Sequence, residues 1–234
     1  MSSYKRVLLK LSGEALSAEK GTGFDDNTCI SVGKQICELV KEGIEVAVVI
    51  GGGNFWRGRS SESIERAKAD QIGMMATIMN SIYMSEICRY VGCGTQIFTP
   101  FTVGAFTELF SIDRVNECFQ DKRIVFFAGG TGHPYFSTDT LMALRAVEIH
   151  ADVILAAKSV NGVYDADPSV NPNARKYDTL TISQVIDDKL GFVDLAAAVL
   201  CYENKVPMMV FGLNEENSIV RAVKGKFAGT MITV

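Results

Sequence analysis

The sequence predicts an α/β fold built on a mainly parallel central sheet. Short aliphatic and β-branched runs alternate with segments whose apolar residues recur at helical spacing. This alternation is typical of parallel strands joined by crossover helices. With 234 residues, of which 47% are hydrophobic, the chain can bury one large core, so a single domain spanning 1–234 is expected.

Apolar runs predict the strands of this sheet. Each run is short, is rich in residues that favour extended backbone, and is bounded by polar or glycine-containing segments. In chain order the expected strands are Val7–Leu11, Val46–Ile50, Gln96–Phe98, Ile124–Phe127, Val153–Leu155, Met208–Phe211 and Met231–Val234.

Helical patterns fill the segments between the early strands. Ile30, Ile36 and Val40 recur at helical spacing, and Gly43 lies where the C-cap of that helix is expected. A longer helix is expected from Asp70 to Tyr90. Its apolar stripe, whose methionines are expected to fill the core, consists of Ile72, Met75, Met79, Ile82 and Tyr83.

The second half of the chain continues the same alternation. Thr181 and Gln184 have the spacing of a helix capping box, and Val193–Tyr202 is rich enough in alanine and leucine to form a helix. The segment Asp165–Lys176 carries two prolines and two asparagines, which predicts a long loop.

Composition argues against several classes of protein. The net charge of -4 provides no broad basic field, so neither nucleic acid nor an anionic membrane is expected as a partner. The six cysteines include no C-x-x-C pair, and buried, reduced thiols are expected rather than a zinc site. No apolar run reaches the length of a membrane span, and Lys10 interrupts the first one, so a cytoplasmic protein is expected.

Two glycine-containing loops follow the first two expected strands, where open parallel sheets bind their ligands. Lys10 precedes Ser12-Gly13, and a lysine beside exposed backbone N–H groups can neutralise phosphate oxygens. The alternative is an edge lysine beside an ordinary turn. Gly51–Asn54 lets backbone approach a ligand closely, and Arg57 can donate two hydrogen bonds to one phosphate. The alternative for Arg57 is a surface arginine that packs on Trp56.

Two further loops follow later strands. Gly129–Pro134 leads through hydroxyl residues to Asp139, and Thr138 is a candidate cap for the helix that starts near Asp139. After the strand ending near Leu155, an Asn-Gly turn at 161–162 is consistent with a plain β-hairpin. In a nucleotide site, Tyr164 could instead stack on a base and Asp167 could bind a sugar or metal-bound water.

Well-known nucleotide motifs are missing from the chain. It contains no G-x-x-x-x-G-K-[ST] P-loop, no G-x-G-x-x-G fingerprint, and no H-R-D or D-F-G set. A P-loop kinase, a Rossmann dehydrogenase and a protein kinase are therefore all disfavoured.

Six segments, taken in order, resemble the amino-acid-kinase superfamily and, within it, the bacterial uridylate kinases: KLSGEAL, VIGGGNFWRG, DQIGMMATIMN, GGTGHPYFSTDT, AKSVNGVYDADP and FVDLAAAVLC. The resemblance implies a three-layer αβα sandwich and transfer of the γ-phosphate of ATP to UMP, a step of pyrimidine nucleotide biosynthesis. Alternatives are a carbamate or carboxylate kinase of the same superfamily and a non-catalytic nucleotide sensor. The Asp70 helix argues against the first, and retention of Lys10, Arg57 and Asp139 argues against the second.

The resemblance also implies roles for individual residues. Catalytic roles fall on Lys10, Arg57 and Asp139. Residues implied to bind ATP are Lys10, Leu11, Ser12, Gly13, Gly53, Arg57, Lys158, Tyr164 and Asp167. Residues implied to bind UMP, with Asp70 at the ribose hydroxyls, are Gly52, Asp70, Thr131, Gly132, His133, Pro134, Tyr135, Phe136, Ser137 and Thr138. The acceptor side thus lies mainly in the first part of the chain, and the ATP side mainly in 150–234.

Cofactor and assembly are likewise implied by the resemblance. Mg²⁺ would arrive with ATP as co-substrate, held by its phosphates, and no protein ligand is assigned to the metal. A homohexamer activated by GTP and inhibited by UTP is implied. The chain departs from the common family pattern at Trp56, His133 and Asn161.

Overall fold

The computed structural model describes residues 4–56, 63–226 and 228–234. Within them, a nine-stranded sheet has the order β4-β3-β5-β2-β1-β6-β10-β11-β9, and β7 and β8 form a separate pair. The strands are β1 Arg6–Leu11, β2 Glu45–Ile50, β3 Thr95–Thr99, β4 Glu108–Leu109, β5 Ile124–Phe127, β6 Val153–Lys158, β7 Val163–Tyr164, β8 Lys176–Tyr177, β9 Thr179–Thr181, β10 Met208–Gly212 and β11 Gly229–Thr233.

The large sheet is mainly parallel, as predicted. β10 and β11 pair antiparallel, whereas the other neighbouring strands of this sheet pair parallel. The carboxyl ends of β1, β2, β5 and β6 therefore meet at one edge. The predicted strands agree with the observed ones to within a few residues, and the run at 231–234 belongs to the antiparallel strand β11.

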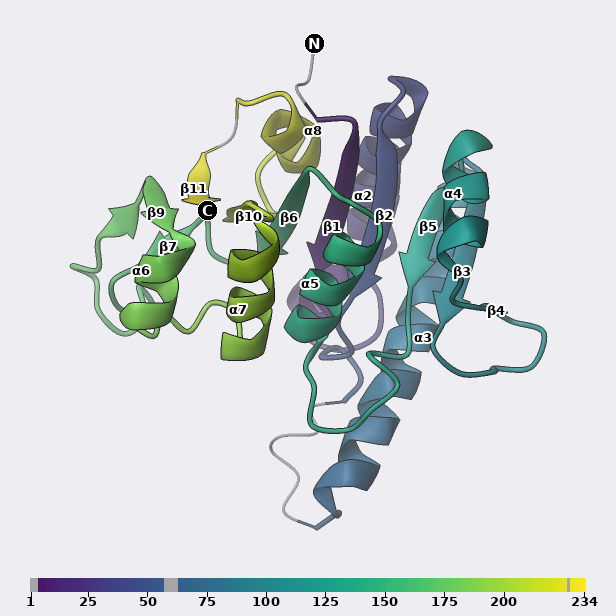
Figure 1. The fold of residues 1–234 in the computed structure, drawn as a ribbon, viewed down its shortest axis with the longest axis horizontal. Coiled ribbons are helices and arrows are strands. Elements are labelled where there is room, and N and C mark those ends of the chain that lie inside the picture. The colour runs from purple at the N-terminus through teal and green to yellow at the C-terminus, as the bar shows by residue number, and fades with distance from the viewer. Residues whose placement is uncertain (1–3, 57–62, 227) are drawn as a thin grey trace.

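Helices cover both faces of the sheet and make three layers (Figure 1). One face packs against α1 Gly13–Ser17, α2 Asp26–Lys41, α3 Arg66–Tyr90 and α8 Ser218–Val223, with the short 3₁₀ turn η1 Ala18–Lys20 following α1. The other face packs against α4 Ile112–Gln120, α5 Thr138–Glu148, α6 Ile182–Asp187 and α7 Leu195–Asn204. The predicted αβα sandwich is confirmed.

Both faces of the central strands are buried, which explains their continuous apolar runs. Along β1, Val7, Leu9 and Leu11 enter one core, and Leu8 enters the other. Lys10 shares the face of Leu8 by strand alternation, so its side chain points towards α5. The strand thereby places one lysine at the sheet edge where ligands are expected.

Several local predictions are confirmed. The capping box of Thr181 and Gln184 is present at the start of α6. Gly43 follows the end of α2 with φ 90°, a backbone conformation that glycine adopts readily. All six cysteines lie in the described part of the chain, buried and unpaired.

The predicted packing of α3 is wrong. Ile72, Met75, Met79 and Ile82 are 40–48% exposed, so this stripe does not fill the core. The helix instead turns Ala69, Met74 and Ile78 inward, together with small polar residues that find hydrogen-bond partners there. Because both faces of α3 carry apolar residues, periodicity alone could not show which face is buried.

Two structural alternatives given above for turn residues do not hold. Val163 and Tyr164 pair with β8 across the long loop and not across the Asn161-Gly162 turn, so that turn is no hairpin. Ser137, not Thr138, caps α5, because its hydroxyl accepts the N–H groups of Asp139 and Thr140. In the part of the chain that the structure describes, no helix is long and apolar enough to span a membrane.

Candidate active site

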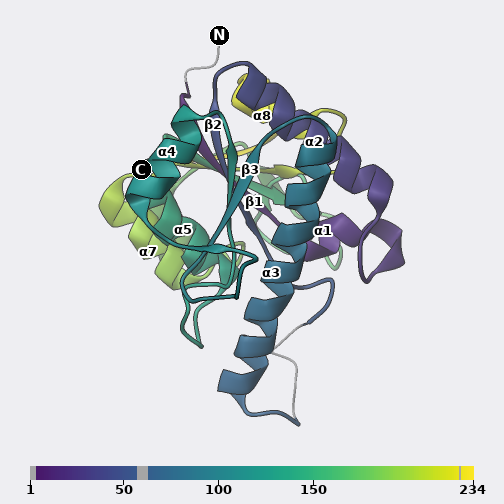
Figure 2. The same cartoon turned by 90° about the vertical axis from the view of Figure 1, so that its right-hand side faces the viewer.

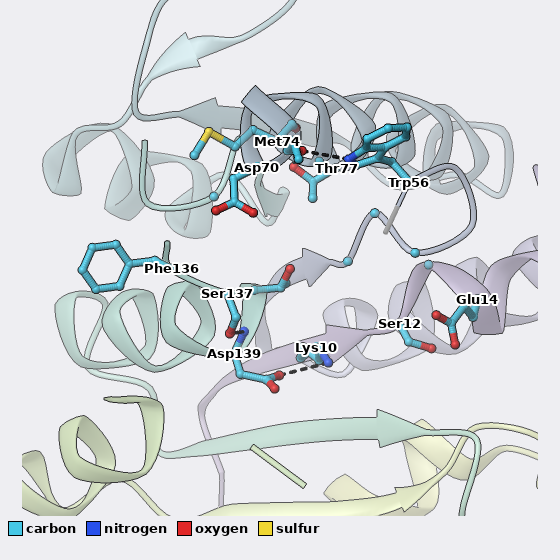
Figure 3. A pocket seen from close by; sticks show the side chains of 18 of the residues that line it. Lys10, Ser12, Glu14, Trp56, Asp70, Met74, Thr77, Phe136, Ser137 and Asp139 are labelled. Carbon is cyan, nitrogen blue, oxygen red and sulfur yellow. Dashed lines mark hydrogen bonds and ion pairs between the residues drawn. The ribbon is translucent and has the colours of Figure 1, made fainter. Parts of the chain in front are cut away.

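A pocket of about 310 Å³ opens at the carboxyl ends of β1, β2 and β5 (Figure 3). The loops after these strands supply Ser12, Gly51–Gly53 and Gly130. One wall comes from the inner face of α3, and the opposite wall comes from Phe136–Asp139 at the start of α5. Segments far apart in the sequence thus meet at the edge where the parallel strands end.

Lys10 and Asp139 form an ion pair across the floor of this pocket. The Lys10 Nζ atom lies 3.0 Å from Asp139 Oδ1, and the two side chains are 9% and 19% exposed. Figure 3 shows the carboxylate reaching from α5 towards the lysine on β1. The pair holds the ammonium group at the pocket in a fixed position, as a charge-stabilising group requires.

Lys158, at the end of β6, is a second lysine beside this pair. Its ammonium donates a 2.7 Å hydrogen bond to the carbonyl oxygen of Phe192. Burial, and secondarily the positive charge of Lys10, lowers the pKa of Lys158 to about 8, while the charge of Asp139 opposes that shift. Two lysines and one carboxylate therefore share a small, partly desolvated region.

Close backbone contacts explain two of the glycines. A Cβ atom at Gly13 would lie 2.4 Å from Asn54 Oδ1 and 2.5 Å from the carbonyl oxygen of Gly51. A Cβ atom at Gly52 would lie 2.9 Å from Cβ of Ala76. Side chains at these positions would force the first two loops and α3 apart. Ser12, which was expected in a glycine-containing loop, caps α1 by accepting the N–H of Ala15.

Two buried asparagines hold the glycine loop against α3. Asn54 and Asn80 exchange side-chain amide hydrogen bonds of 3.0 and 2.8 Å. Asn80 also donates to the carbonyl oxygen of Gly51, and Asn54 donates to that of Gly23. Each amide is thus bonded on both sides, which rigidifies the loop.

Asp70, which the resemblance implies as a UMP-binding residue, stands on the inner face of α3 and lines the pocket. Its carboxylate accepts hydrogen bonds of 3.0 and 2.9 Å from Nε of Arg66. It also accepts the backbone N–H of Tyr135 at 2.8 Å, which ties the 131–138 loop to α3. Figure 3 shows Asp70 and Phe136 facing the same space from the two walls.

Asp194 connects the starts of α5 and α7. It caps α7 by accepting the N–H of Ala197 at 2.8 Å. Its other oxygen accepts the hydroxyls of Ser137 and Thr140 on α5. The wall that carries Ser137 is therefore fixed to an element from the second half of the chain.

A second hollow, of about 410 Å³, lies beside β7. Tyr164 and Asp167 line it together with 188–192. The Tyr164 hydroxyl donates to Asn161, and Asp167 accepts the N–H and hydroxyl of Ser169, which lower the pKa of Asp167. Lys158, bonded to Phe192 in this wall and close to Lys10, lies between the two hollows.

The structure brings many of the predicted site residues together. Those that line the first pocket are Lys10, Ser12, Gly13, Gly52, Gly53, Asp70, Phe136, Ser137, Thr138 and Asp139. The Leu11 side chain is fully buried in the core. Thr131, Gly132, His133 and Pro134 belong to the loop leading to Phe136 and are not among the lining residues. Arg57 lies outside the described residues.

Sequence reasoning missed several residues of the pocket. Glu14, Arg66, Met74 and Thr77 line it, and the amide of Asn80 supports its glycine loop. Arg66 was detectable in principle, since it stands four residues before Asp70 and so shares its helix face. The amide of Asn80, by contrast, lies on a helix with no glycine-rich signal nearby.

The charged residues that line the pocket show whether it is suited to a metal ion. Among its described lining residues are the cations Lys10 and Arg66 and the acids Glu14, Asp70 and Asp139. These side chains alone do not neutralise two polyanionic ligands. Asp139 Oδ1 is buried, and besides the ammonium group of Lys10 at 3.0 Å it has no hydrogen-bond donor among the described residues. A carboxylate oxygen of this kind fits a hydrated Mg²⁺, although no group of three or more His, Cys, Asp or Glu among those residues could hold a metal by itself.

Comparison with known proteins places this chain in a family. The model of the amino acid kinase family matches residues 5–212, which is most of the chain. The chain belongs to the amino acid kinase family.

Solved structures resemble this amino acid kinase over nearly its full length. The UMP kinase from Bacillus anthracis is 35% identical with a TM-score of 0.93, and the match covers 98% of this chain and 96% of that chain. The UMP kinase from Ureaplasma parvum is 31% identical with a TM-score of 0.93, covering 98% and 99%. The uridylate kinase from Archaeoglobus fulgidus is 29% identical with a TM-score of 0.73, covering both chains fully at 100%.

Proposed function

We propose that this amino acid kinase is a UMP kinase, which transfers the γ-phosphate of Mg-ATP to UMP and forms UDP and ADP. The observation that carries this proposal is the end-to-end likeness to two UMP kinases, at 31% and 35% identity and a TM-score of 0.93. The pocket at the strand ends supports it, because glycine loops, a buried lysine and a carboxylate are groups that serve phosphoryl transfer.

The two substrates would occupy different parts of one domain spanning 1–234. UMP would lie between α3 and the 131–138 loop, with Gly52 at its phosphate and Asp70 at its ribose hydroxyls. ATP would extend from Lys10, Ser12, Gly13 and Gly53 past Lys158 to Tyr164 and Asp167. The position of Lys158 between the two hollows supports a bound molecule that reaches both.

The reaction needs charge control more than proton transfer. The phosphate of UMP is ionised near neutral pH, so no general base is required to create the nucleophile. The main barrier is the approach of two polyanions in line. Lys10 would bind the oxygens of the transferred phosphoryl group. Asp139 would hold the Lys10 ammonium group in place through their 3.0 Å ion pair. Arg57 is proposed to neutralise the same phosphates.

Mg²⁺ is proposed to enter with ATP. When bound, it would neutralise the phosphate charge that the described lining leaves uncompensated. Asp139 is the residue best suited to contact water in its hydration shell, because Oδ1 is buried at the pocket with Lys10 as its one partner among the described residues. The role of Asp139 is thus to orient Lys10 and metal-bound water, and it takes no proton from UMP.

The pathway, the compartment and the assembly are proposed from the same likeness to UMP kinases. UDP formation would place the chain in pyrimidine nucleotide biosynthesis, in the cytoplasm, and the six buried, unpaired cysteines agree with a reducing compartment. A homohexamer activated by GTP and inhibited by UTP remains a further proposal. The measurable consequence is a change in UMP kinase rate when either nucleotide is added.

Acceptor specificity tests the proposed function. ADP release from Mg-ATP would be measured with UMP, CMP, dUMP, AMP, carbamate and an N-acetylated amino acid as separate acceptors. UMP is expected to give the highest kcat/KM by at least tenfold over AMP, carbamate and the amino acid. A higher kcat/KM with carbamate or the amino acid would contradict the proposal, as would no ADP release with every nucleotide.

A further inference from the structure

The loop that follows β5 is attached to α3 at two points. Near its start, the backbone N–H of Gly129 donates a 2.9 Å hydrogen bond to the hydroxyl oxygen of Thr77. Near its end, the N–H of Tyr135 donates to the carboxylate of Asp70 at 2.8 Å. Asp70 and Thr77 are seven residues apart, so they share one face of the helix and lie about 10 Å apart along its axis. The 129–135 loop therefore spans about two turns of α3.

Both attachment points lie at the pocket. Figures 1 and 2 show the N-terminal half of α3 extending past the sheet, with the loop between β5 and α5 beside it. Figure 3 shows Asp70, Met74 and Thr77 along the pocket side of the helix. These three residues line the pocket, as does Gly130 of the loop. A shift of the loop at either point would therefore change the pocket wall.

The hydroxyl of Thr77 makes two hydrogen bonds in a buried position. It donates to the carbonyl oxygen of Met74 at 2.7 Å, which is the ordinary bond of a threonine inside a helix. The bond that it accepts from Gly129 is additional and joins the helix to another element. Because this bond is buried, removal of the hydroxyl would leave the Gly129 N–H without a partner unless the loop moves.

Both loops that are proposed to hold UMP meet α3 around Thr77. A Cβ atom at Gly130 would lie 3.4 Å from Cγ of Met74. In the other loop, a Cβ atom at Gly52 would lie 3.6 Å from the backbone nitrogen of Thr77. The helix at this position therefore sets the distance between the two loops.

We propose that Thr77 is a positioning residue for UMP. Its hydroxyl fixes the start of the 129–135 loop to α3, and this contact keeps the loop at the distance from Gly52 that bound UMP requires. Thr77 acts through the backbone of Gly129 and needs no contact with UMP, whereas Asp70 at the other end of the loop is proposed to bind the ribose. The inference rests on the proposed function, because it concerns the affinity for UMP.

Removal of the Thr77 hydroxyl tests this role. Thr77→Val nearly keeps the shape of the side chain and removes its donor and its acceptor. KM for UMP, and the dissociation constant of UMP from calorimetry, should rise by roughly tenfold, because the loop is no longer held in place before UMP binds. KM for ATP should change by less than about twofold, and Thr77→Ser, which keeps the hydroxyl, should keep KM for UMP within about threefold of the wild type.

Ser85→Ala is the matched control. Ser85 is a buried hydroxyl residue on the same helix, bonded to Thr95 at the start of β3 at 2.7 Å, and it lies outside the described lining of the pocket. Its removal should lower the melting temperature and leave KM for UMP within about twofold of the wild type. A folded Thr77→Val variant with unchanged KM for UMP, or with KM for ATP raised as much as KM for UMP, would overturn the proposal.

Hydrogen exchange follows the attachment of the loop without a rate assay. In the unliganded protein, the amides of 129–135 should exchange faster in Thr77→Val than in the wild type, and at the wild-type rate in Ser85→Ala. If Thr77→Val does not fold, Thr77→Ala removes the same hydroxyl with a smaller side chain and should give the same results. Equal exchange in the wild type and the folded variant would overturn the proposal. A wild type that neither binds nor phosphorylates UMP would overturn the proposed function and this inference with it, whereas an active wild type with unchanged Thr77 variants overturns this inference alone.

Discussion

Lys10 is the residue on which the proposed transfer depends most. It is the buried cation of the first pocket and is paired with Asp139 at 3.0 Å. Lys10→Ala is expected to lower kcat by about 10²-fold or more, because a charge contact made in the transition state is lost. UMP binding, followed by calorimetry, should remain measurable. Lys5→Ala, at an exposed position just before β1, is the control; full turnover in a folded Lys10→Ala variant would remove this lysine from the mechanism.

Titration of Lys158 should make kcat/KM for ATP fall as the pH rises. Because its pKa is lowered to about 8, the free enzyme loses this positive charge as the pH rises through that value. If Lys158 binds phosphate, kcat/KM for ATP should fall above about pH 8, and kcat should fall only at higher pH, since bound phosphate stabilises the ammonium form. Steady-state rates between pH 6.5 and 10 measure both, with Lys158→Met as the comparison, in which the fall near pH 8 should vanish. If kcat/KM for ATP falls near pH 8 in Lys158→Met as well, the fall is caused by another titrating group.

Substitution of Asp70 should affect the affinity for UMP more than the affinity for ATP. Asp70→Asn should weaken UMP binding by roughly tenfold while changing ATP binding less than twofold, because a carboxylate accepts sugar hydroxyls better than an amide does. The substitution also removes the charge that faces Arg66, so Arg66→Gln serves as the control that keeps the carboxylate. Calorimetric titration of each ligand gives the affinities. Equal losses for ATP and UMP in Asp70→Asn would contradict its acceptor-side position.

At the scale of single residues, the sequence indicated a pocket residue where that residue lies close to the end of a predicted strand or to a glycine loop. Lys10, Gly52 and Asp139 stand within a few residues of predicted strands or glycine loops, and the structure brings them to one pocket. Asn80 and Asp194 support that pocket from helix positions far along the chain. Their bonds are tertiary contacts, which a local pattern does not contain.

At the scale of elements, Asp194 links α5 to α7. Asp194→Ala removes an N-cap and two hydroxyl contacts, and it should lower the free energy of unfolding by about 2 to 3 kcal/mol. Asp25 offers a matched control, because it caps α2 with contacts to Thr28 and Lys20 only a few residues away. Urea denaturation should show a smaller loss for Asp25→Ala than for Asp194→Ala. Equal losses would mean that the link to α5 adds nothing to stability.

The helices show where sequence patterns succeed and fail. The extent of α3 was predicted to within four residues, because a long apolar and methionine-rich segment has few alternatives. The sequence did not predict which face of α3 is buried. The inward face uses Thr77, Asn80 and Ser85, whose burial depends on hydrogen bonds formed only in the fold. The short helices α1, α4 and α8 were missed, because five to nine residues give little periodicity.

At the scale of the whole molecule, the buried cysteines report on the integrity of both cores. Burial raises the pKa of the Cys29 and Cys201 thiols to about 12, and these residues lie in the two cores on opposite faces of the sheet. A thiol-specific disulfide reagent should therefore label less than one thiol per native chain in minutes, and all six in denaturant. Rapid labelling of several thiols without denaturant would show that one of the cores opens readily.

The overall architecture was predictable from apolar runs that alternate with helical patterns, since the central strands are buried on both faces. The order of strands was not predictable, because β1 pairs with β2 and β6, more than a hundred residues apart from each other. Such pairings are decided by packing across the whole chain. The antiparallel direction of β11 is a further example, as an apolar run carries no sign of its direction.

The measurement that tests the central claim most directly is the fate of the γ-phosphate. ATP labelled in that position would be incubated with UMP, Mg²⁺ and the full chain, and the products would be separated by chromatography. The account predicts label in the β-phosphate of UDP, with one ADP formed for each UDP. Label released as inorganic phosphate at the same rate with and without UMP, and none in UDP, would contradict it.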